Sequence, residues 1–184
     1  MAGATLTEPP ETVWVGPRVV VAASRVEGRG LFAAEDIPSG TIVIRLGGRL
    51  VSSAELRDLI AQADADPAAP YVDTITVDDD AHLVLPPGTV AHFGNHSCDP
   101  TLWHVGPFDV AARRDVRRGE ELTTDYGTTS GAAGFAMACR CGAPSCRGEV
   151  TSEDWRLPEL QRRYAGHWAP ALRSRIEAQR GDRP

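Results

Sequence analysis

The four cysteines of the chain have the spacing of metal ligands. Cys139, Cys141 and Cys146 form a C-x-C-x4-C triplet with glycine and proline between its members, and Cys98 lies about forty residues upstream. Structural zinc takes four soft ligands in a tetrahedron, and the triplet supplies three of them. A site on Cys98, Cys139, Cys141 and Cys146 uses every cysteine in the chain, whereas unrelated free cysteines leave a tight triplet unexplained. The spacing therefore predicts one structural zinc ion.

Cys98 also allows a different interpretation, as a nucleophile with His96 or His104 as its base. A catalytic Cys98 would leave the triplet without a fourth cysteine. We therefore favour the metal site over the nucleophile.

Two further segments have the composition of ligand-binding loops. Gly28, Arg29 and Gly30 form a G-x-G pattern, which allows a tight turn with exposed peptide groups, although a simple hairpin turn explains it too. The pattern lacks the third glycine and the following helix of a dinucleotide site. Asn95, the only asparagine of the chain, offers a donor and an acceptor and suits a zwitterionic ligand. The neighbouring His96 is either catalytic or structural.

A polar stretch that contains Glu121 and Asp125 ends at Tyr126. The two acids are either a catalytic pair or one solvated face of a short strand. Tyr126 either presents its hydroxyl group to a cleft or is a half-buried strand residue. For the two acids the solvated face is the more common case, whereas the stretch is equally compatible with both interpretations of Tyr126.

Short apolar runs separated by glycine, proline and aspartate predict a mainly β domain that positions these residues. The predicted strands are Val19–Ala23, Leu31–Ala33, Thr41–Leu46, Tyr71–Val77, His82–Leu85 and Phe108–Ala112. One helix interrupts them, with Ser52 as its N-cap and Glu55 completing a capping box. We expect this helix to end before Asp64–Pro70 and to bury Leu56, Leu59 and Ile60.

After Trp155 the pattern changes to that of a helical tail. Pro158 and Pro170 suit the first positions of two short helices. Leu172 and Ile176 lie four residues apart, on one face of the second helix.

The composition excludes some classes of function. The 184 residues suffice for one domain with a hydrophobic core. The net charge of −6 argues against a general nucleic-acid or anionic-membrane binder and suits a basic partner. All 19 basic residues are arginine. The N-terminal residues lack the pattern of a signal peptide, and no apolar run approaches the ~20 residues of a membrane span. We therefore expect a cytoplasmic protein with reduced cysteines.

Four segments, in this order, resemble the SET-domain lysine methyltransferases. They are the G-x-G segment Gly28–Gly30, the N-H-S-C-x-P segment Asn95–Pro100, the G-E-E-L-x-x-D-Y segment Gly119–Tyr126, and the cysteine triplet, which is similar to a post-SET motif. The resemblance covers roughly residues 18–150. It implies a β-clip-like fold of small sheets, in which a C-terminal segment threads under a preceding loop as a pseudoknot and brings Asn95 and Tyr126 together.

The resemblance also implies how the chain is divided. Residues 1–17 would be a lead, 18–130 the SET domain, 131–150 the post-SET zinc segment and 151–184 the helical tail, for which no family role is evident. The cofactor would be S-adenosylmethionine. Its methionine end would lie on the backbone of Gly28, Arg29 and Gly30, its polar groups would be held by Asn95, and its adenine would meet the main chain of His96 and be covered by Phe135 or Met137.

By the same resemblance, Tyr126 is the catalytic tyrosine and Tyr71 lines the channel for the substrate lysine. Two positions depart from the family pattern. Thr101 replaces an asparagine, which we expect to loosen one loop contact. Thr124 replaces a tyrosine or phenylalanine that restricts the space around the amine, so the number of methyl groups transferred stays open.

The implied reaction is methyl transfer to the ε-amine of a lysine in a protein substrate, which we expect to be basic. With a reference pKa near 10.4, on the order of one lysine in a thousand is neutral at physiological pH. A desolvating channel and the sulfonium charge favour the neutral amine, so no strong general base is needed.

Two other functions remain as alternatives. One is a catalytically inactive SET module that binds a basic peptide. The other is a zinc-stabilised nucleic-acid-binding protein that uses a cluster of arginines, which nearby acids dilute. The cluster is Arg113, Arg114, Arg117 and Arg118.

Overall fold

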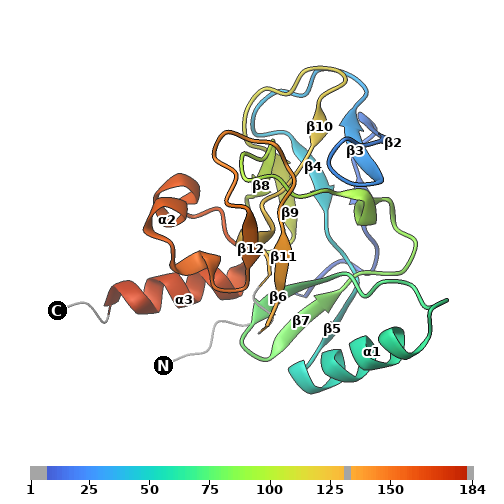
Figure 1. Cartoon of the computed structure of the whole chain (residues 1–184), viewed down its shortest axis with the longest axis vertical. Coiled ribbons are helices and arrows are strands. Elements are labelled where there is room, and N and C mark those ends of the chain that lie inside the picture. The colour runs from blue at the N-terminus through green and yellow to red at the C-terminus, as the bar shows by residue number, and fades with distance from the viewer. Residues whose placement is uncertain (1–7, 131–133, 182–184) are drawn as a thin grey trace.

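A computed structural model describes residues 8–130 and 134–181 (Figure 1). Residues 1–7, 131–133 and 182–184, which belong to the predicted lead, post-SET segment and tail, lie outside the described residues. The described chain forms small antiparallel sheets together with α-helices and short 3₁₀ helices. The predicted fold class, a mainly β fold of small sheets with short helices, is confirmed.

The strands within the described part of the chain form four sheets. The first has the order β1 (Trp14–Val15), β4 (Ile42–Arg45), β9 (Asp109–Ala112), β8 (Leu102–His104). The second has the order β10 (Glu121–Leu122), β3 (Arg29–Ala33), β2 (Val19–Ala23). The third has the order β5 (Arg49–Val51), β7 (Ala81–Val84), β6 (Thr74–Asp78). The fourth is the hairpin of β11 (Ala136–Ala138) and β12 (Glu149–Thr151).

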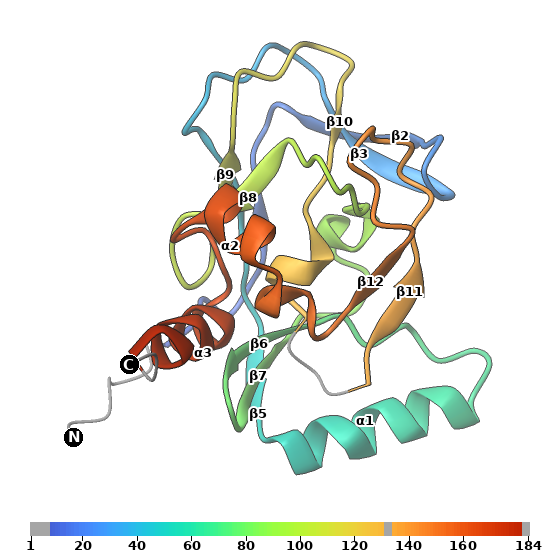
Figure 2. The same ribbon diagram turned by 60° about the vertical axis from the view of Figure 1, so that its left-hand side comes forward.

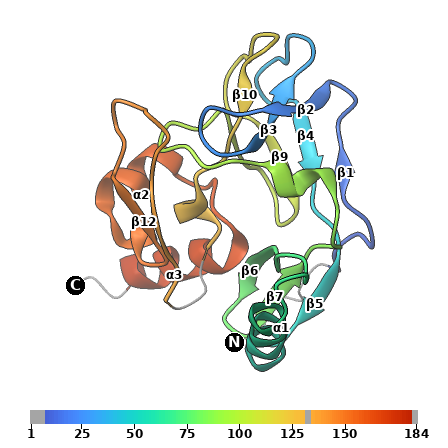
Figure 3. The same ribbon diagram turned by 45° about the vertical axis from the view of Figure 1, so that its right-hand side comes forward.

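The helices connect or flank these sheets. The α-helices are α1 (Ser53–Ala65), α2 (Pro158–Tyr164) and α3 (Pro170–Gly181). The 3₁₀ helices are η1 (Val90–Phe93), η2 (Tyr126–Thr128) and η3 (Asp154–Arg156). The sheet β2–β3–β10 forms one end of the molecule, and α1 with the sheet β5–β7–β6 forms the other (Figures 2 and 3). No helix among the described residues has the length and apolar character needed to cross a membrane.

The predicted strands correspond to β2, β3, β4, β7 and β9 with small changes at their ends. The predicted strand Tyr71–Val77 is corrected, because strand pairing begins only at Thr74. The partner strand β7 ends at Val84, and beyond it only the N–H of Leu85 reaches the carbonyl oxygen of Asp73. The residues before Thr74 therefore stay outside the sheet and border a cavity.

Helix α1 begins as predicted, because Oγ of Ser52 accepts the backbone N–H of Glu55 at 3.2 Å. The helix extends to Ala65, slightly into the predicted loop. Its predicted apolar face is only partly buried. Leu56 is buried, whereas Ile60 is 38% exposed and lines an outer groove.

Two clusters of apolar side chains form the core. The larger lies between the sheets and includes Leu31, Leu83 and Leu122, which are inaccessible to solvent. The second belongs to the tail and consists of Trp155, Leu160, Tyr164, Trp168, Leu172 and Ile176. The tail thus has its own small core, and α3 packs beside β6 (Figure 2).

Candidate active site

Tyr126 begins η2 directly after the β10 segment and is held at both ends. Its backbone N–H donates to Nδ1 of His96 at 3.1 Å, and its hydroxyl group donates to the carbonyl oxygen of Gly94 at 2.6 Å. A parallel bridge joins His96 to Thr124. The expected meeting of the Asn95 and Tyr126 segments is therefore confirmed, while the threading of a pseudoknot stays a prediction.

Tyr126 lines two separate cavities. The larger, of about 360 Å³, includes Asn95 and His96. The smaller, of about 150 Å³, includes Tyr71 and Thr124. Tyr126 therefore stands where a ligand in one cavity could react with an acceptor in the other.

The side-chain amide of Asn95 ties the predicted glycine turn to β10. Nδ2 of Asn95 donates to the carbonyl oxygens of Glu27 at 3.2 Å and Arg29 at 3.0 Å. It also donates to Oε1 of Glu121 at 2.8 Å. A Cβ atom at Gly30 would collide with Glu121 and crowd Asn95. Packing therefore explains why glycine occupies position 30, in addition to the backbone contact with cofactor that the resemblance implies.

Gly28, Arg29 and Gly30 do not line the larger cavity, whereas Val26 and Glu27, directly before them, do. Gly28 has a φ of +43°, in the left-handed region that favours glycine. The guanidinium group of Arg29 lies 4.3 Å from the ring centroid of Phe93. Of the two residues predicted to cover adenine, Met137 lines this cavity, whereas Phe135 lines the smaller one.

Tyr71 stands at the mouth of the smaller cavity. It is 79% exposed, and it lines both this cavity and an outer groove of about 560 Å³. The groove runs from Ile60 on α1 to Phe135 and shares Phe135 with the inner cavity. Tyr71 and Thr124 therefore lie where a side chain entering from the groove would pass.

The environment keeps both the Tyr126 hydroxyl group and the His96 ring neutral. Burial, followed by the charges of Asp73 and Tyr71, raises the pKa of Tyr126 well above its usual value. Its protonated hydroxyl group retains lone pairs for an incoming N–H. Burial lowers the pKa of His96, although Asp125 opposes this change. A neutral imidazole ring explains how Nδ1 accepts the N–H of Tyr126.

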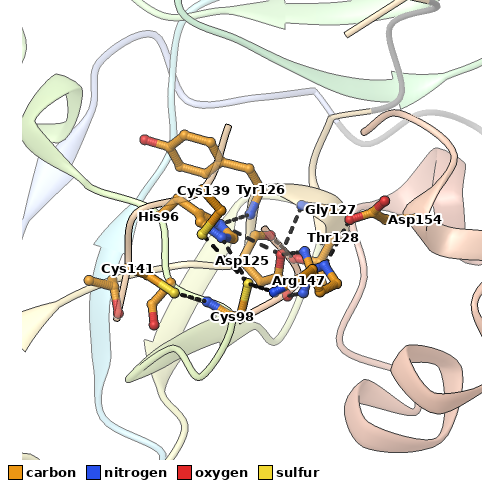
Figure 4. Close-up of polar contacts among 12 residues, drawn as sticks. His96, Cys98, Asp125, Tyr126, Gly127, Thr128, Cys139, Cys141, Arg147 and Asp154 are labelled. Atoms are coloured by element: carbon orange, nitrogen blue, oxygen red, sulfur yellow. Dashed lines mark hydrogen bonds and ion pairs between the residues drawn. The ribbon is translucent and has the colours of Figure 1, made fainter. Parts of the chain in front are cut away.

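Cys98, Cys139 and Cys141 come together with His96 beside Tyr126 (Figure 4). Sγ of Cys98 lies 3.7 Å from Sγ of Cys139. A tetrahedral site with a Zn–S bond of about 2.3 Å has an S···S edge of about 3.8 Å. Sγ of Cys141 accepts the N–H of Cys98 at 3.4 Å, and Sγ of Cys98 accepts the N–H of Arg147 at 3.4 Å. The sulfur geometry and these N–H donors fit a metal bound by thiolates.

His96 and Cys146 compete for the fourth ligand position. The donor atoms of His96, Cys98, Cys139 and Cys141 all lie within 4.8 Å of one another. However, Nδ1 of His96 accepts an N–H, so Nε2 carries the hydrogen and donates it to Sγ of Cys98 at 3.4 Å. Cys146 is not in this group of four, and its Sγ lies 3.9 Å from the carbonyl oxygen of Cys139. Because the ring of His96 already accepts one hydrogen bond and donates another, Cys146 stays the predicted fourth ligand, with His96 as a residue that supports Cys98.

The same contacts weigh against a nucleophilic Cys98. His96 does touch its sulfur, but Cys98 is 0% exposed and burial raises the pKa of its thiol. A reactive cysteine is accessible and readily ionised. His104, the other predicted base, lines the smaller cavity instead.

Asp125 lies in a buried charge network that local sequence patterns did not predict. It accepts from Nη1 and Nη2 of Arg147 at 2.8 and 2.6 Å and from the hydroxyl group of Tyr164 at 2.7 Å. Nε of Arg147 also donates to Asp154 at 2.9 Å. Asp125 is 1% exposed, so it is neither on a solvated face nor paired with Glu121. The partners come from three separate segments, which is why no sequence spacing indicated them (Figure 4).

The contacts of Thr101 contradict the expectation that this residue loosens a loop contact. Its hydroxyl group donates to the carbonyl oxygen of Glu121 at 3.1 Å and accepts the N–H of Thr123 at 2.9 Å. The threonine therefore fastens its loop to β10 and does not loosen it.

The arginine cluster lacks the free cationic surface of a nucleic-acid site. Three of its members pair with carboxylates. The pairs are Arg113–Asp99, Arg114–Glu120 and Arg117–Asp36. Such internal pairing weakens the field that phosphates would require.

Comparison with known proteins shows the family to which the chain belongs. The SET-domain family model matches residues 28–127, and the chain belongs to this family. Curated relatives include the H3 lysine-36-specific histone-lysine N-methyltransferase of Schizosaccharomyces pombe, 30% identical over 81% of this chain and 20% of that protein. Human histone-lysine N-methyltransferase 2B is 34% identical over 70% of this chain and 5% of its own length.

The chain spans a fifth or less of the length of these two relatives. Among solved structures, the methyltransferase domain of human histone-lysine N-methyltransferase SETMAR shares the fold, with a TM-score of 0.56 and 23% identity. The likeness covers 71% of this chain and 56% of that one.

Proposed function

We propose that this protein transfers a methyl group from S-adenosylmethionine to the ε-amine of a lysine in another protein. The observation that carries the proposal is the position of Tyr126, which lines both the cavity beside Asn95 and the cavity beside Tyr71. Membership of the SET-domain family and the names of the relatives support it.

In this proposal the larger cavity holds S-adenosylmethionine, which supplies the methyl group. The residues with roles there are Gly28, Arg29, Gly30, Asn95 and His96. Asn95 and His96 line this cavity, and the amide oxygen of an asparagine can accept from the ammonium end of a zwitterion. The glycine turn follows Glu27, another lining residue, and Asn95 is bonded to the carbonyl oxygens of Glu27 and Arg29. Met137, which lines this cavity, would cover the adenine.

The smaller cavity would hold the lysine side chain, which enters past Tyr71. The protonated hydroxyl group of Tyr126 donates to Gly94, so its oxygen can accept an N–H of the amine and orient the nitrogen. A hydroxyl group held in this state is no general base, and the amine releases its proton to water. Positioning in a desolvated channel would therefore supply much of the rate.

Zinc is proposed on Cys98, Cys139, Cys141 and Cys146, in a structural role. Four thiolates leave no open position on the metal, so the ion would fix the loop from Cys139 to Cys146 against Cys98. This loop follows Met137, which lines the larger cavity. The metal would thus stabilise one wall of the cofactor site and take no part in the reaction.

The partner is proposed to be a lysine-containing, basic protein. The relatives are named as histone-lysine methyltransferases, and the net charge of −6 suits a cationic partner. Histone H3 and a lysate in which lysines are exposed on many proteins are therefore suitable probes.

The test is methyl transfer from labelled S-adenosylmethionine to these probes by the parental protein and by Tyr126→Phe. Removing the hydroxyl group should leave the cofactor Kd within about twofold and lower kcat by about a hundredfold or more, because its contact is made mainly in the transition state. A parental rate for Tyr126→Phe would contradict its assignment. Cofactor binding without transfer to any probe would favour the inactive peptide-binding module.

A further inference from the structure

The smaller cavity contains a carboxyl group that no sequence motif indicated. Asp73 lines it together with Tyr71 and Tyr126, and only 29% of its side chain is exposed. A carboxylate in a recess lined mostly by apolar residues costs free energy unless it has partners. Its presence therefore calls for a ligand or a partner.

His92 is one partner, and it fixes the orientation of the carboxyl group. Nδ1 of His92 lies 3.0 Å from Oδ2 of Asp73, and Nε2 lies 3.2 Å from the carbonyl oxygen of Pro86. Because a carbonyl oxygen only accepts, Nε2 carries a hydrogen, and a further hydrogen must lie between Nδ1 and Oδ2. A carboxylate has about four lone-pair directions, so it keeps the capacity to accept from a ligand in the cavity.

We propose that Asp73, oriented by His92, binds the ammonium group of the incoming side chain and selects a cationic acceptor for Tyr126. This inference rests on the proposed function, in which the smaller cavity takes a lysine. It adds a recognition residue that the family motifs in this chain do not contain.

The other polar groups of the cavity leave this role to Asp73. A phenol hydroxyl group has a reference pKa near 10 and is neutral at physiological pH, which holds for the exposed Tyr71. Burial raises the pKa of Tyr126 further. Burial lowers the pKa of His104 to about 4, and its Nδ1 has no partner among the described residues. Among the described residues that line this cavity, Asp73 is therefore the carboxyl group that an ammonium ion can meet. Burial raises the pKa of Asp73, and His92 opposes that rise.

Recognition of the ammonium form has a kinetic consequence. The bound ammonium must release one proton to water before its nitrogen becomes a nucleophile. Loss of the Asp73 charge should therefore weaken binding of the protein substrate and raise KM by about tenfold. The effect on kcat should be smaller, because the carboxylate favours the protonated amine and not the reactive one.

The decisive probe is n-butylammonium, which reproduces a lysine side chain beyond its Cα atom, compared with n-butanol, its uncharged counterpart of similar length. Binding is followed by NMR titration of the backbone amides near Tyr71 and Tyr126. The parental protein should bind butylammonium about tenfold more tightly than butanol. Asp73→Asn should bring this ratio close to one. Asp58→Asn, the same charge change at an exposed position of α1, should keep the parental ratio.

A ratio near one in the parental protein would overturn the inference, whatever the variants do, so a variant that fails to fold leaves the test intact. An equal loss of preference in Asp58→Asn would also overturn it, since net charge alone would then explain the effect. A preserved, Asp73-dependent ratio supports the cation site even if no methyl transfer is found, in which case the proposed function alone fails. If the parental protein transfers methyl groups but binds butylammonium and butanol equally well, the inference about Asp73 fails and the proposed function stands.

Discussion

His96 and Cys98 illustrate how two residues in one motif acquire different tasks. The ring of His96 receives the N–H of Tyr126 at Nδ1 and gives its own N–H to Sγ of Cys98. One imidazole thus connects the tyrosine proposed to orient the substrate amine with a sulfur of the proposed zinc site. Hydrogen bonds of this kind orient metal ligands and tune their affinity without coordination.

This assignment gives a prediction about metal content. The parental protein, purified in reducing buffer, should contain one zinc ion per chain. Cys146→Ala should lose most of it, because three thiolates bind zinc far less tightly than four. His96→Asn should retain one zinc ion with affinity lowered by about 10–100-fold, as expected for a supporting residue.

Elemental analysis and competition with a chelator measure both quantities. Cys146→Ala retaining its zinc while His96→Asn loses it would instead make His96 the fourth ligand. Metal-free parental protein would contradict the site as a whole.

At the scale of elements, the C-terminal helices support the segments that carry the site. The hydroxyl group of Tyr164 at the end of α2 donates to Asp125, and Nη1 of Arg163 donates to the carbonyl oxygen of Cys98 at 2.8 Å. The N–H of Ala169, just before α3, donates to the carbonyl oxygen of Thr128 at 2.9 Å. Residues on both sides of Tyr126 are therefore held by a tail for which the sequence indicated no role.

Tyr164→Phe tests this support with little change in packing. The variant removes a buried hydrogen bond to a carboxylate and should lower the free energy of unfolding by about 1.5–3 kcal/mol. Tyr71→Phe is the matched control, because Tyr71 is 79% exposed and the same change there should cost less than about 0.5 kcal/mol. Urea unfolding followed by circular dichroism compares the three proteins. Equal midpoints and slopes for Tyr164→Phe and the parental protein would show that the tail does not hold Asp125.

Elements with strong local signals were predictable, and those defined by distant partners were not. Helix α1 has a capping residue at Ser52, and that signal acts within one turn. The strand β10 has only Glu121 and Leu122, which pair with Phe32 and Leu31 far upstream. No periodicity exists in so short a strand, so its pairing follows from the fold. The exposure of Ile60 was not predicted for a similar reason. The helix period places Ile60 on the apolar face, but in the folded chain this residue lines the outer groove.

At the scale of the whole molecule, the site is assembled from segments far apart in the chain. The zinc ligands could be proposed from the sequence because the chain holds only the four cysteines that one site needs. The pairs Asp73–His92 and Asp125–Arg147 follow no common spacing, and only the folded chain brings them together. The sequence therefore indicated the chemistry of the motifs, while the structure added the residues that orient and support them.

A property of the whole chain gives a test of acceptor chemistry. All 19 basic residues are arginine, so the protein offers no lysine side chain to its own active site. Its α-amino group, with a reference pKa of about 7.7–8.0, is the remaining amine, and Met1 lies outside the described residues. The tag-free protein incubated with labelled S-adenosylmethionine should therefore carry essentially no label, and any trace should map to the N-terminus.

Adding a lysine-rich protein should move the label onto that protein, and Tyr126→Phe should remove it. Peptide mapping by mass spectrometry locates each methyl group and distinguishes lysine from other acceptors. The absence of self-labelling has diagnostic value because arginine and histidine side chains are abundant in the chain, with 19 and 5 residues. Stable label on either type would mean that the smaller cavity accepts a different nucleophile. The lysine assignment would then fail although the SET fold stands, and ammonium recognition by Asp73 would need a new ligand.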